Sequence, residues 1–436
     1  LTMSGGTDTS TGYAKGTATS SYRGINVQGS ITTGAGNVTM RGEDAATEKT
    51  GAGNNTAWGA GITFTDDSSL TTTSGTITLT GLTNSDNVTQ IHRHAGVMIG
   101  MHYFDGTLQD SYADASISSG TGAITIAGTG TNSSYQYRDG VMFLQGSVTS
   151  TSGPIVIDGR TSRTDAYDIN FGVSRTGNTV SSGGSVSITG DTNGALSNFV
   201  SSTISSGGTL TLNVNKPTFT SMTMNGAGSK IIQHPTTATN FGSAVDITGV
   251  SFASTSTTLT VGRAGVTPTQ AVTLGNANTS IAGNVTVYGA AITQSGAVVT
   301  TSGGNVTYSG AGAYSQSGAL TSAGSITQTG GTTVSVTGAT SAVGAISYTG
   351  SGAVSNGSAG TIRSTGSSVT IASTGSTMAL GGNVTAATSV SISQTGTSSG
   401  AGAIAANGGT LSISGGTSVA PTGAISASGN ITISGS

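Results

Sequence analysis

A short word of glycine, asparagine and alternating residues recurs through the second half of the chain at a nearly constant spacing. One copy is Gly303-Gly304-Asn305-Val306-Thr307-Tyr308. The first apolar residue of each copy lies 20 to 23 residues from the next, and these residues are Val285, Val306, Ile326, Ile346, Val369, Val390, Leu411 and Ile431. A fixed period of this size is typical of a solenoid, in which each repeat buries its apolar edge only against a neighbour.

The alternation within this word predicts a β-strand with two different faces. Val306 and Tyr308 point to one face, and Thr307 points to the other. We expect the inward Val, Ile and Leu side chains to form ladders, and the outward Thr and Ser to face solvent. Glycine is expected to supply corners of positive φ, and asparagines such as Asn284 and Asn305 to tolerate a left-handed corner or to form amide ladders.

The first half of the chain keeps this strand and adds longer segments between the copies. Each unit is predicted to contain a strand, a short turn, a second strand and then a variable segment. The first strands are expected at 24–27, 61–64, 96–99, 140–143 and 168–171, and the second strands at 36–40, 75–79, 122–126, 154–157, 184–188 and 208–212. The extra length lies mainly in one phase, in the insertion segments 41–60, 82–95, 129–139 and 160–167.

Composition excludes several classes of protein. Charged residues make up 7% of the chain, against about 25% in a soluble globular domain, yet the period-2 apolar pattern argues against disorder. The net charge of -3 gives no support for binding nucleic acid, and no apolar run is long enough for a membrane-spanning helix. The absence of cysteine removes disulfide and thiolate chemistry and fits a secreted bacterial surface protein.

These observations predict an all-β chain folded as a right-handed parallel β-helix, with about 20–21 residues per undecorated rung. We expect one continuous solenoid with a decorated part at 1–200, a transitional part at 201–282 and regular low-charge repeats at 283–436. The chain shows no signal peptide and no capping segment at either end, so we interpret it as an internal piece of a longer protein, or as a chain capped by copies of itself.

The Gly-Asn-Val-Thr word at 283–286 and the Gly-Gly-Thr-Leu-Ser-Ile word at 408–413 resemble the repeat region of filamentous-haemagglutinin-type exoproteins. The resemblance covers most of the chain and is strongest at 24–212 and 283–436, but the N-terminal secretion domain of that family is not present. It implies a right-handed β-helix on a bacterial surface, an adhesive or structural role, and an outer-membrane transporter or anchor outside this chain. It supplies no catalytic residues, and we expect no metal or cofactor.

Candidate ligand-binding residues are the charged and aromatic side chains in or beside the insertion segments, which are expected to emerge on one side of the solenoid. Exposed aromatic rings stack on sugars or anchor a protein partner, and the alternative is that they pack the segments onto the scaffold. The candidates are Trp58, His92, His94, Tyr135, Tyr137, Arg138, Arg160, Arg163 and Tyr167.

Other chemistries receive weaker support. His92, His94 and His102 have the residue type of a zinc or nickel site, but we interpret them as surface histidines of a polar segment and predict no metal there. Asp158, Arg160, Arg163, Asp165 and Asp168 form the densest charge cluster, which we interpret as surface ion pairs because no carboxylate pair repeats on adjacent rungs. Asp66 and Asp67 lack a repeated calcium motif, and Ser, Gln and Tyr interrupt the outward threonine rank that ice binding requires.

The function that agrees best with this pattern is a non-enzymatic, secreted cell-surface adhesin or stalk, a rigid rod that displays its insertions to a glycan or protein receptor on a host cell, a neighbouring cell or a surface. A self-assembling extracellular fibre or sheath, stacked end to end or side by side, is the structural alternative. A polysaccharide lyase or glycosidase on a β-helix is the enzymatic alternative.

Overall fold

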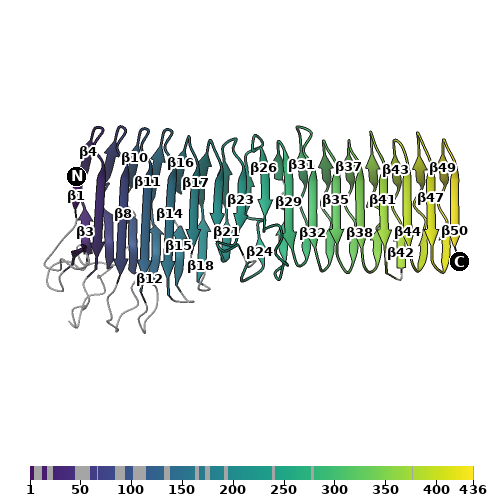
Figure 1. Cartoon of the computed structure of the whole chain (residues 1–436), viewed down its shortest axis with the longest axis horizontal. Coiled ribbons are helices and arrows are strands. Elements are labelled where there is room, and N and C mark those ends of the chain that lie inside the picture. The colour runs from purple at the N-terminus through teal and green to yellow at the C-terminus, as the bar shows by residue number, and fades with distance from the viewer. Residues whose placement is uncertain are drawn as a thin grey trace. The chain divides into compact units, whose positions relative to one another are not determined.

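The computed structural model describes residues 1–3, 12–16, 23–44, 59–65, 67–83, 94–101, 114–131, 138–162, 166–171, 177–190, 195–237, 241–275, 279–375 and 377–435. The chain forms two compact units, unit 1 (residues 1–236) and unit 2 (residues 237–436). Every regular element of the described residues is a β-strand, and the strands of each unit pair in parallel (Figure 1). Each unit is a right-handed parallel β-helix, as predicted.

Unit 1 has three sheets, N1, N2 and N3, and each rung of the chain passes through N2, N3 and N1 in that order. Sheet N1 contains β5 (Val38–Glu43), β8 (Ile77–Thr83), β11 (Ile124–Gly130), β14 (Ile155–Thr161), β17 (Val186–Gly190), β20 (Leu210–Asn213) and β23 (Lys230–Gln233), and the short β1 (Thr2–Met3) and β2 (Ala14–Lys15) pair with β5. Sheet N2 contains β3 (Arg23–Val27), β6 (Ala60–Thr65), β9 (His94–Met101), β12 (Arg138–Phe143), β15 (Tyr167–Phe171), β18 (Leu196–Val200) and β21 (Lys216–Thr220). Sheet N3 contains β4 (Ser30–Thr33), β7 (Ser69–Thr72), β10 (Ala115–Ser119), β13 (Gly146–Ser150), β16 (Asn178–Ser182), β19 (Ser202–Ser206) and β22 (Met222–Asn225).

Unit 2 also has three sheets, C1, C2 and C3, which the chain visits in that order from β26 onward. Sheet C1 contains β26 (Thr258–Val261), β29 (Asn284–Gly289), β32 (Val306–Gly310), β35 (Ile326–Gly330), β38 (Ile346–Gly350), β41 (Val369–Ser373), β44 (Val390–Gln394), β47 (Leu411–Gly415) and β50 (Ile431–Gly435). Sheet C2 contains β24 (Val245–Asp246), β27 (Val272–Leu274), β30 (Ile292–Gln294), β33 (Tyr314–Gln316), β36 (Val334–Val336), β39 (Val354–Asn356), β42 (Thr377–Leu380), β45 (Thr397–Gly400) and β48 (Ser418–Pro421). Sheet C3 contains β28 (Thr279–Ile281), β31 (Val298–Thr300), β34 (Leu320–Ser322), β37 (Thr340–Ala342), β40 (Ile362–Ser364), β43 (Val384–Ala386), β46 (Ile404–Ala406) and β49 (Ile425–Ala427), and β25 (Val250–Phe252) precedes β26 in the chain.

The predicted register of the repeat is confirmed. The eight apolar markers of the second half pair with one another in sequence along C1, beginning with Val285 opposite Val306 and ending with Leu411 opposite Ile431. The markers of the first half pair in the same way along N1, as Ile77 opposite Ile124 and Ile124 opposite Ile155 illustrate. A shift of one residue would turn every inward side chain outward, and the apolar pattern therefore selects this register.

The remaining strands of each rung differ from the sequence prediction, which placed only a short turn between the two strands of the first half. The strands of N3 occupy that position, and Ile117 of β10 and Val148 of β13 are fully buried. In unit 2, the strands of C2 and C3 are mostly three residues long. Such short strands carry one or two inward side chains each, which is too few to establish a periodicity in the sequence.

The corner asparagines act differently from the prediction. Asn284 Oδ1 accepts a hydrogen bond from the backbone N–H of Asn305 at 2.8 Å, and Asn305 Oδ1 accepts one from Ser325 N–H at 2.7 Å. Neither asparagine adopts a positive φ, and each joins its corner to the backbone of the next rung. Glycine also has two roles here, because Gly303 has a φ of +72°, whereas a Cβ on Gly304 would lie 2.1 Å from the carbonyl oxygen of Gly283.

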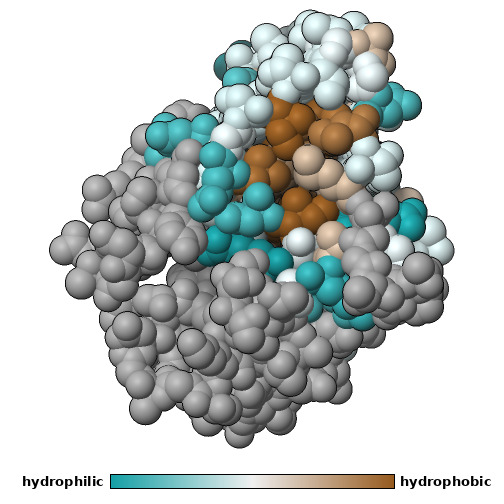
Figure 2. Space-filling view, turned by 90° about the vertical axis from the view of Figure 1, so that its left-hand side faces the viewer, coloured by the Kyte–Doolittle hydropathy of each residue, from teal (hydrophilic) through white to brown (hydrophobic). Residues whose placement is uncertain are grey.

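Aromatic side chains form a ladder in the core of unit 1. Phe143 stacks on Phe171 with ring centroids 4.5 Å apart and an interplanar angle of 5°. The ladder continues from Phe171 to Phe199 at 5.4 Å and from Phe199 to Phe219 at 5.5 Å. Figure 2 views the molecule from the end that is on the left in Figure 1, and in the described part of that end apolar residues lie together with hydrophilic residues beside them.

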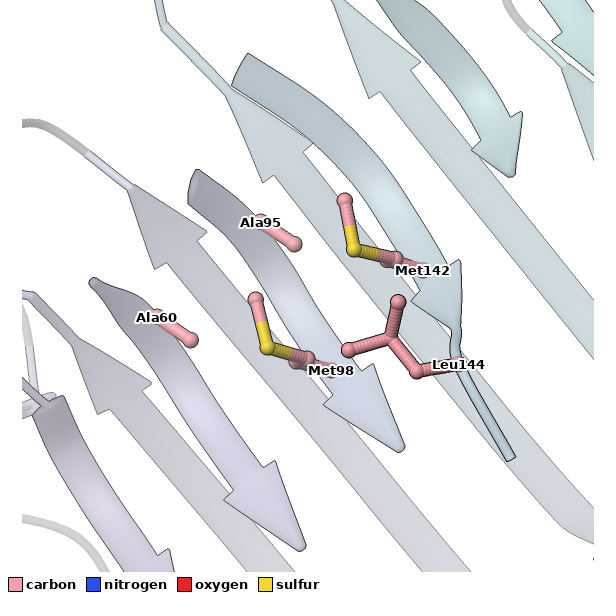
Figure 3. Close-up of a cluster of buried hydrophobic side chains, with 5 residues drawn as sticks. All are labelled: Ala60, Ala95, Met98, Met142 and Leu144. Atoms are coloured by element: carbon pink, nitrogen blue, oxygen red, sulfur yellow. The ribbon is translucent and has the colours of Figure 1, made fainter. Parts of the chain in front are cut away.

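Three successive strands of N2 are buried on both faces, unlike the predicted pattern of inward apolar and outward polar residues. All six residues of β6 and of β12 are buried. Met98 and Met142, which follow the inward Val97 and Val141, are 0% exposed and belong to one cluster with three other buried residues (Figure 3). The other members of this cluster are Ala60, Ala95 and Leu144.

The core of unit 2 contains a buried group of tyrosine and glutamine side chains. Tyr314 and Tyr348 each donate a hydrogen bond to Gln316 Oε1 at 3.0 Å, and Gln316 Nε2 donates to Thr340 Oγ1 at 2.9 Å. Tyr308 donates to Gln294 Oε1 at 3.1 Å. Burial raises the pKa of all three tyrosines well above the usual value, so that they stay neutral donors.

Candidate functional site

The insertion segments of unit 1 all connect the end of an N1 strand to the start of an N2 strand. The described residues at the ends of these segments form what we call the insertion corner, at 43–44, 82–83, 129–131 and 160–162 on N1 and at 59–60, 94–95, 138–139 and 166–168 on N2. On N1, Glu43 pairs with Leu82, and Thr129 pairs with both Leu82 and Arg160. The segments therefore leave the scaffold at equivalent positions of successive rungs. One segment outside this phase, at 102–113, follows β9 and precedes β10.

Sheets N1 and N2 meet at a seam of paired glycines just before the insertion corner. A Cβ on Gly81 would lie 1.8 Å from the carbonyl oxygen of Gly96, and a Cβ on Gly128 would lie 2.0 Å from that of Gly140. Gly42 stands in the same relation to Gly61 one rung earlier, at 1.9 Å. The two backbones can approach this closely only because neither carries a side chain. On each strand the seam separates residues of the apolar core from those of the corner.

Beyond the seam lies the corner cluster, which consists of Asp44, Thr83, His94 and Arg138. Thr83 Oγ1 donates to Asp44 Oδ2 at 2.5 Å, and Arg138 Nη1 donates to Thr83 Oγ1 at 3.3 Å. His94 Nδ1 lies 3.7 Å from Asp44 Oδ2, which is longer than a hydrogen bond. All four residues are at most 4% exposed. Four polar side chains from four different rungs are thus held together inside the protein.

A second set of buried polar groups continues along N2 from the corner cluster. Asp139 accepts hydrogen bonds from the Tyr167 backbone N–H at 3.0 Å and from Asn170 Nδ2 at 2.9 Å. Asn170 Oδ1 in turn accepts from Asn198 Nδ2 at 3.2 Å. Asp168 is 0% exposed and accepts from the Thr161 backbone N–H at 2.8 Å. These bonds connect neighbouring rungs at the base of the insertion segments.

The chemistry of the corner is that of a structural clamp. A buried charge is tolerated only when it is paired and hydrogen-bonded, and removing one partner of a buried pair costs about 3–5 kcal/mol. Asp44 is shared between Thr83 and His94, and Asp139 binds a backbone amide and a side-chain amide. The corner therefore ties together the points at which the insertion segments begin and end. At its outer end, Lys15 Nζ lies 3.6 Å from Glu43 Oε2.

The structure places the predicted site residues in different environments. His94 and Arg138 are corrections to the expectation of a displayed face, because they are 4% and 2% exposed and belong to β9 and β12. Tyr167 is half-buried at the start of β15. Arg160 is exposed and forms a two-pronged ion pair with Asp158, at 2.9 and 3.2 Å. The other candidates lie outside the described residues, and these are Trp58, His92, Tyr135, Tyr137 and Arg163.

The charge cluster at 158–168 does not form a single group in its described part. Asp158 pairs with Arg160 on the outer face, as expected for a surface ion pair, whereas Asp168 is buried against Thr161. Arg163 and Asp165 lie outside the described residues, as do His102 and Asp66 of the metal-site hypotheses. The corner residues that the sequence prediction did not include, such as Asp44 and Thr83, follow a glycine that recurs at the same place in β5, β8, β11, β14 and β17. That recurrence was the available signal.

Comparison with protein-family models, with curated proteins and with solved structures found no match. The resemblance to filamentous-haemagglutinin-type proteins therefore stays a prediction from the sequence. In the part of the chain that the structure describes, no helix is long and apolar enough to cross a membrane.

Proposed function

We propose that this chain is part of a non-catalytic, secreted surface adhesin or stalk, in which the β-helix carries the insertion segments of unit 1 toward a receptor. The observation that carries the proposal is the register of the insertion corner. Segments rich in charged and aromatic residues begin and end at equivalent positions of four successive rungs, above a clamp of buried polar groups. A recognition surface built from segments on a rigid scaffold is the usual arrangement in binding proteins.

The contrast between the two units also supports this function. Unit 2 repeats one short rung and has only three charged residues, Asp246, Arg263 and Arg363. Such a unit supplies length and stability rather than recognition. In the proposed arrangement the partner is a glycan or protein receptor on a host cell, a neighbouring cell or a surface. An outer-membrane transporter or anchor outside this chain exports the protein or holds it.

The test replaces one insertion segment at a time and leaves the corner intact. Residues 45–58 or 132–137 are exchanged for glycine–serine linkers of equal length, which keeps Asp44, Thr83 and Arg138 in place. Adhesion to cells or coated surfaces is expected to fall at least about tenfold for one or more variants, since a few anchor residues dominate binding. Circular dichroism should keep the β-sheet signal.

The matched control changes two outward hydroxyls of unit 2, Ser309→Ala and Ser393→Ala, and should adhere as the wild type does. If every insertion variant adheres normally, the insertion segments are not the recognition surface and the proposal is wrong. Release of new reducing ends from mixed polysaccharides would instead support the enzymatic alternative.

A further inference from the structure

The outer face of N1 from β14 to β23 carries a connected row of polar side chains that the insertion segments do not include. Asp158, Thr189, Asn213 and Gln233 occupy the same outward position on four successive strands, because Asp158 pairs with Thr189, Thr189 with Asn213, and Asn213 with Gln233. We call these residues, together with Arg160, the outer ladder. Successive strands lie about 4.8 Å apart, so the ladder extends over roughly 14 Å.

Hydrogen bonds within the outer ladder hold its side chains in place. Gln233 Nε2 donates to Asn213 Oδ1 at 2.9 Å, and Asn213 Nδ2 donates to Thr189 Oγ1 at 3.3 Å. At the other end, the guanidinium of Arg160 grips the carboxylate of Asp158 at 2.9 and 3.2 Å. Side chains that are already ordered lose less conformational entropy when a ligand binds. Each amide still has a second N–H that these two bonds do not use, and Gln233 keeps its carbonyl oxygen.

The face is neutral and partly apolar. Asp158 and Arg160 cancel each other's charge, and the other members of the ladder are uncharged. Val156 precedes Asp158 by two residues on the same face of β14 and is 38% exposed, one of the few large apolar side chains of the described residues with that exposure. The distance between these two positions along a strand is about 7 Å. The paired Asp158 and Arg160 therefore lie beside exposed hydrocarbon on β14, and the amides of Asn213 and Gln233 follow two and three strands away on the same face.

A neutral sugar polymer has the chemistry that matches this face. Its hydroxyl groups are both donors and acceptors, as amides require, and the C–H faces of its rings can cover an exposed valine. A protein partner usually needs large aromatic or arginine anchors that become fully buried, and the only such side chain in the ladder, Arg160, is already paired. We infer that the outer ladder is a binding site for an uncharged linear polysaccharide that lies across β14, β17, β20 and β23.

This inference rests on the proposed adhesive function and assigns a second contact surface to it. The test is affinity electrophoresis of the full chain in gels that contain dextran, a β-glucan, galactomannan or, as a charged reference, heparin. The wild type is expected to be retarded by at least one neutral polymer. Asn213→Ala combined with Gln233→Ala should weaken that binding at least about tenfold, because both side chains that offer amide hydrogen bonds to the polymer are lost.

Two controls separate recognition from folding. Thr78→Ala combined with Thr125→Ala changes outward residues of β8 and β11 on the same sheet and should leave the retardation unchanged. Asn213→Gln, which keeps an amide, should retain more binding than Asn213→Ala. The inference is overturned if no neutral polymer retards the wild type, if only heparin does, or if the double alanine variant is retarded as strongly as the wild type.

The same variants distinguish this inference from the proposed function. If the wild type does not bind neutral polymers and the double alanine variant adheres normally, the polysaccharide site is wrong. Adhesion through the insertion segments is not contradicted by that result. The opposite outcome is also possible. If the insertion variants adhere normally and the chain still binds a neutral polysaccharide, the insertion segments are not the recognition surface, and the outer ladder remains a polysaccharide-binding site.

Discussion

A few inward positions of the repeat carry polar residues in place of Val, Ile or Leu, and the hydrogen bonds of these residues are made within the core. Gln316 and Tyr348 occupy inward positions that the pattern reserves for Val, Ile or Leu, and both are buried. They fit because Gln316 accepts from two tyrosine hydroxyls and donates to Thr340. A buried polar group costs free energy only if its hydrogen bonds are missing, and here they are made within the core.

Replacing Gln316 by leucine should therefore destabilise unit 2. The variant removes the acceptor of Tyr314 and Tyr348, and we expect the free energy of unfolding to fall by about 2–4 kcal/mol. Urea unfolding followed by the near-ultraviolet circular dichroism of tyrosine measures the change. Ser335→Ala, on the outward face of β36, is the control and should change stability by less than about 0.5 kcal/mol. An equal effect of the two variants would contradict the role of the network.

Lys230 is the second exception at the residue scale. It takes the inward position of β23 opposite Leu210, and its ammonium donates to the carbonyl oxygens of Gly226 and Gly228, both at 2.9 Å. Burial lowers the pKa of Lys230 to about 8 from its usual value of 10.5. The folded protein therefore holds this proton less tightly than the unfolded chain does.

The expected consequence is a rise in stability with pH between about 8 and 10.5, since the unfolded state binds more protons in that window. The gain from Lys230 should be on the order of 1–3 kcal/mol and should be absent in Lys230→Met. Ionisation of tyrosines in the unfolded chain acts in the other direction near pH 10, so the difference between wild type and variant is the quantity to measure. If the difference in unfolding free energy between wild type and Lys230→Met does not change with pH, the lowered pKa of Lys230 does not contribute to stability.

At the scale of the elements, the glycine seam decides how closely N1 and N2 approach. The sequence shows a glycine after the core residues of β5, β8, β11, β14 and β17, but glycine is so frequent in this chain that this recurrence is hard to recognise. Only the structure pairs Gly81 with Gly96 and Gly128 with Gly140. The seam then explains why polar residues such as Asp44 and Arg138 can be buried beside an apolar core without entering it.

Gly81→Ala should destabilise unit 1 by about 2–4 kcal/mol, because the new Cβ would overlap the carbonyl oxygen of Gly96 and force the strands apart. Gly34→Ala is the matched control, since a Cβ at Gly34 meets no atom within 4 Å. Hydrogen exchange should report faster opening of β8 and β9 in Gly81→Ala alone. If both variants exchange at the wild-type rate, the close approach does not contribute to stability.

At the scale of the whole molecule, the two units use different sources of stability. Unit 1 combines an aromatic ladder with buried ionic groups, whereas unit 2 relies on apolar ladders and uncharged hydrogen bonds. Of the thirteen lysine and arginine residues, only Arg263 and Arg363 belong to unit 2, and Asp246 is its only acidic residue. Unit 2 therefore has few interactions between charges that dissolved salt could screen.

We therefore expect salt to leave unit 2 almost unchanged. Raising the NaCl concentration from about 0.05 to 0.5 M should alter its opening free energy by less than about 0.5 kcal/mol, since screening affects only interactions between charges. Hydrogen exchange with mass spectrometry resolves the two units within the intact chain. If salt changes the opening free energy of unit 2 as much as that of unit 1, interactions between charges contribute to the stability of unit 2 and the prediction is wrong.

The sequence by itself determined the fold class, the period and the register of the main sheet of each unit. These properties follow from alternation and spacing, because a strand with one apolar face has one register that buries it. The markers from Val285 to Ile431 pair as their spacing requires. Sequence reasoning also recognised that the first half carries segments in a repeated phase.

The tertiary structure decided which polar residues are buried and what they contact. His94 and Arg138 are residue types that are usual on an exposed surface. They are nevertheless buried, because Asp44 and Thr83 from other rungs lie next to them. The outer ladder likewise exists only once Asp158, Thr189, Asn213 and Gln233 stand on adjacent strands. Contacts between residues some 20 to 55 positions apart depend on how rungs of unequal length stack, and no local pattern in the sequence records that.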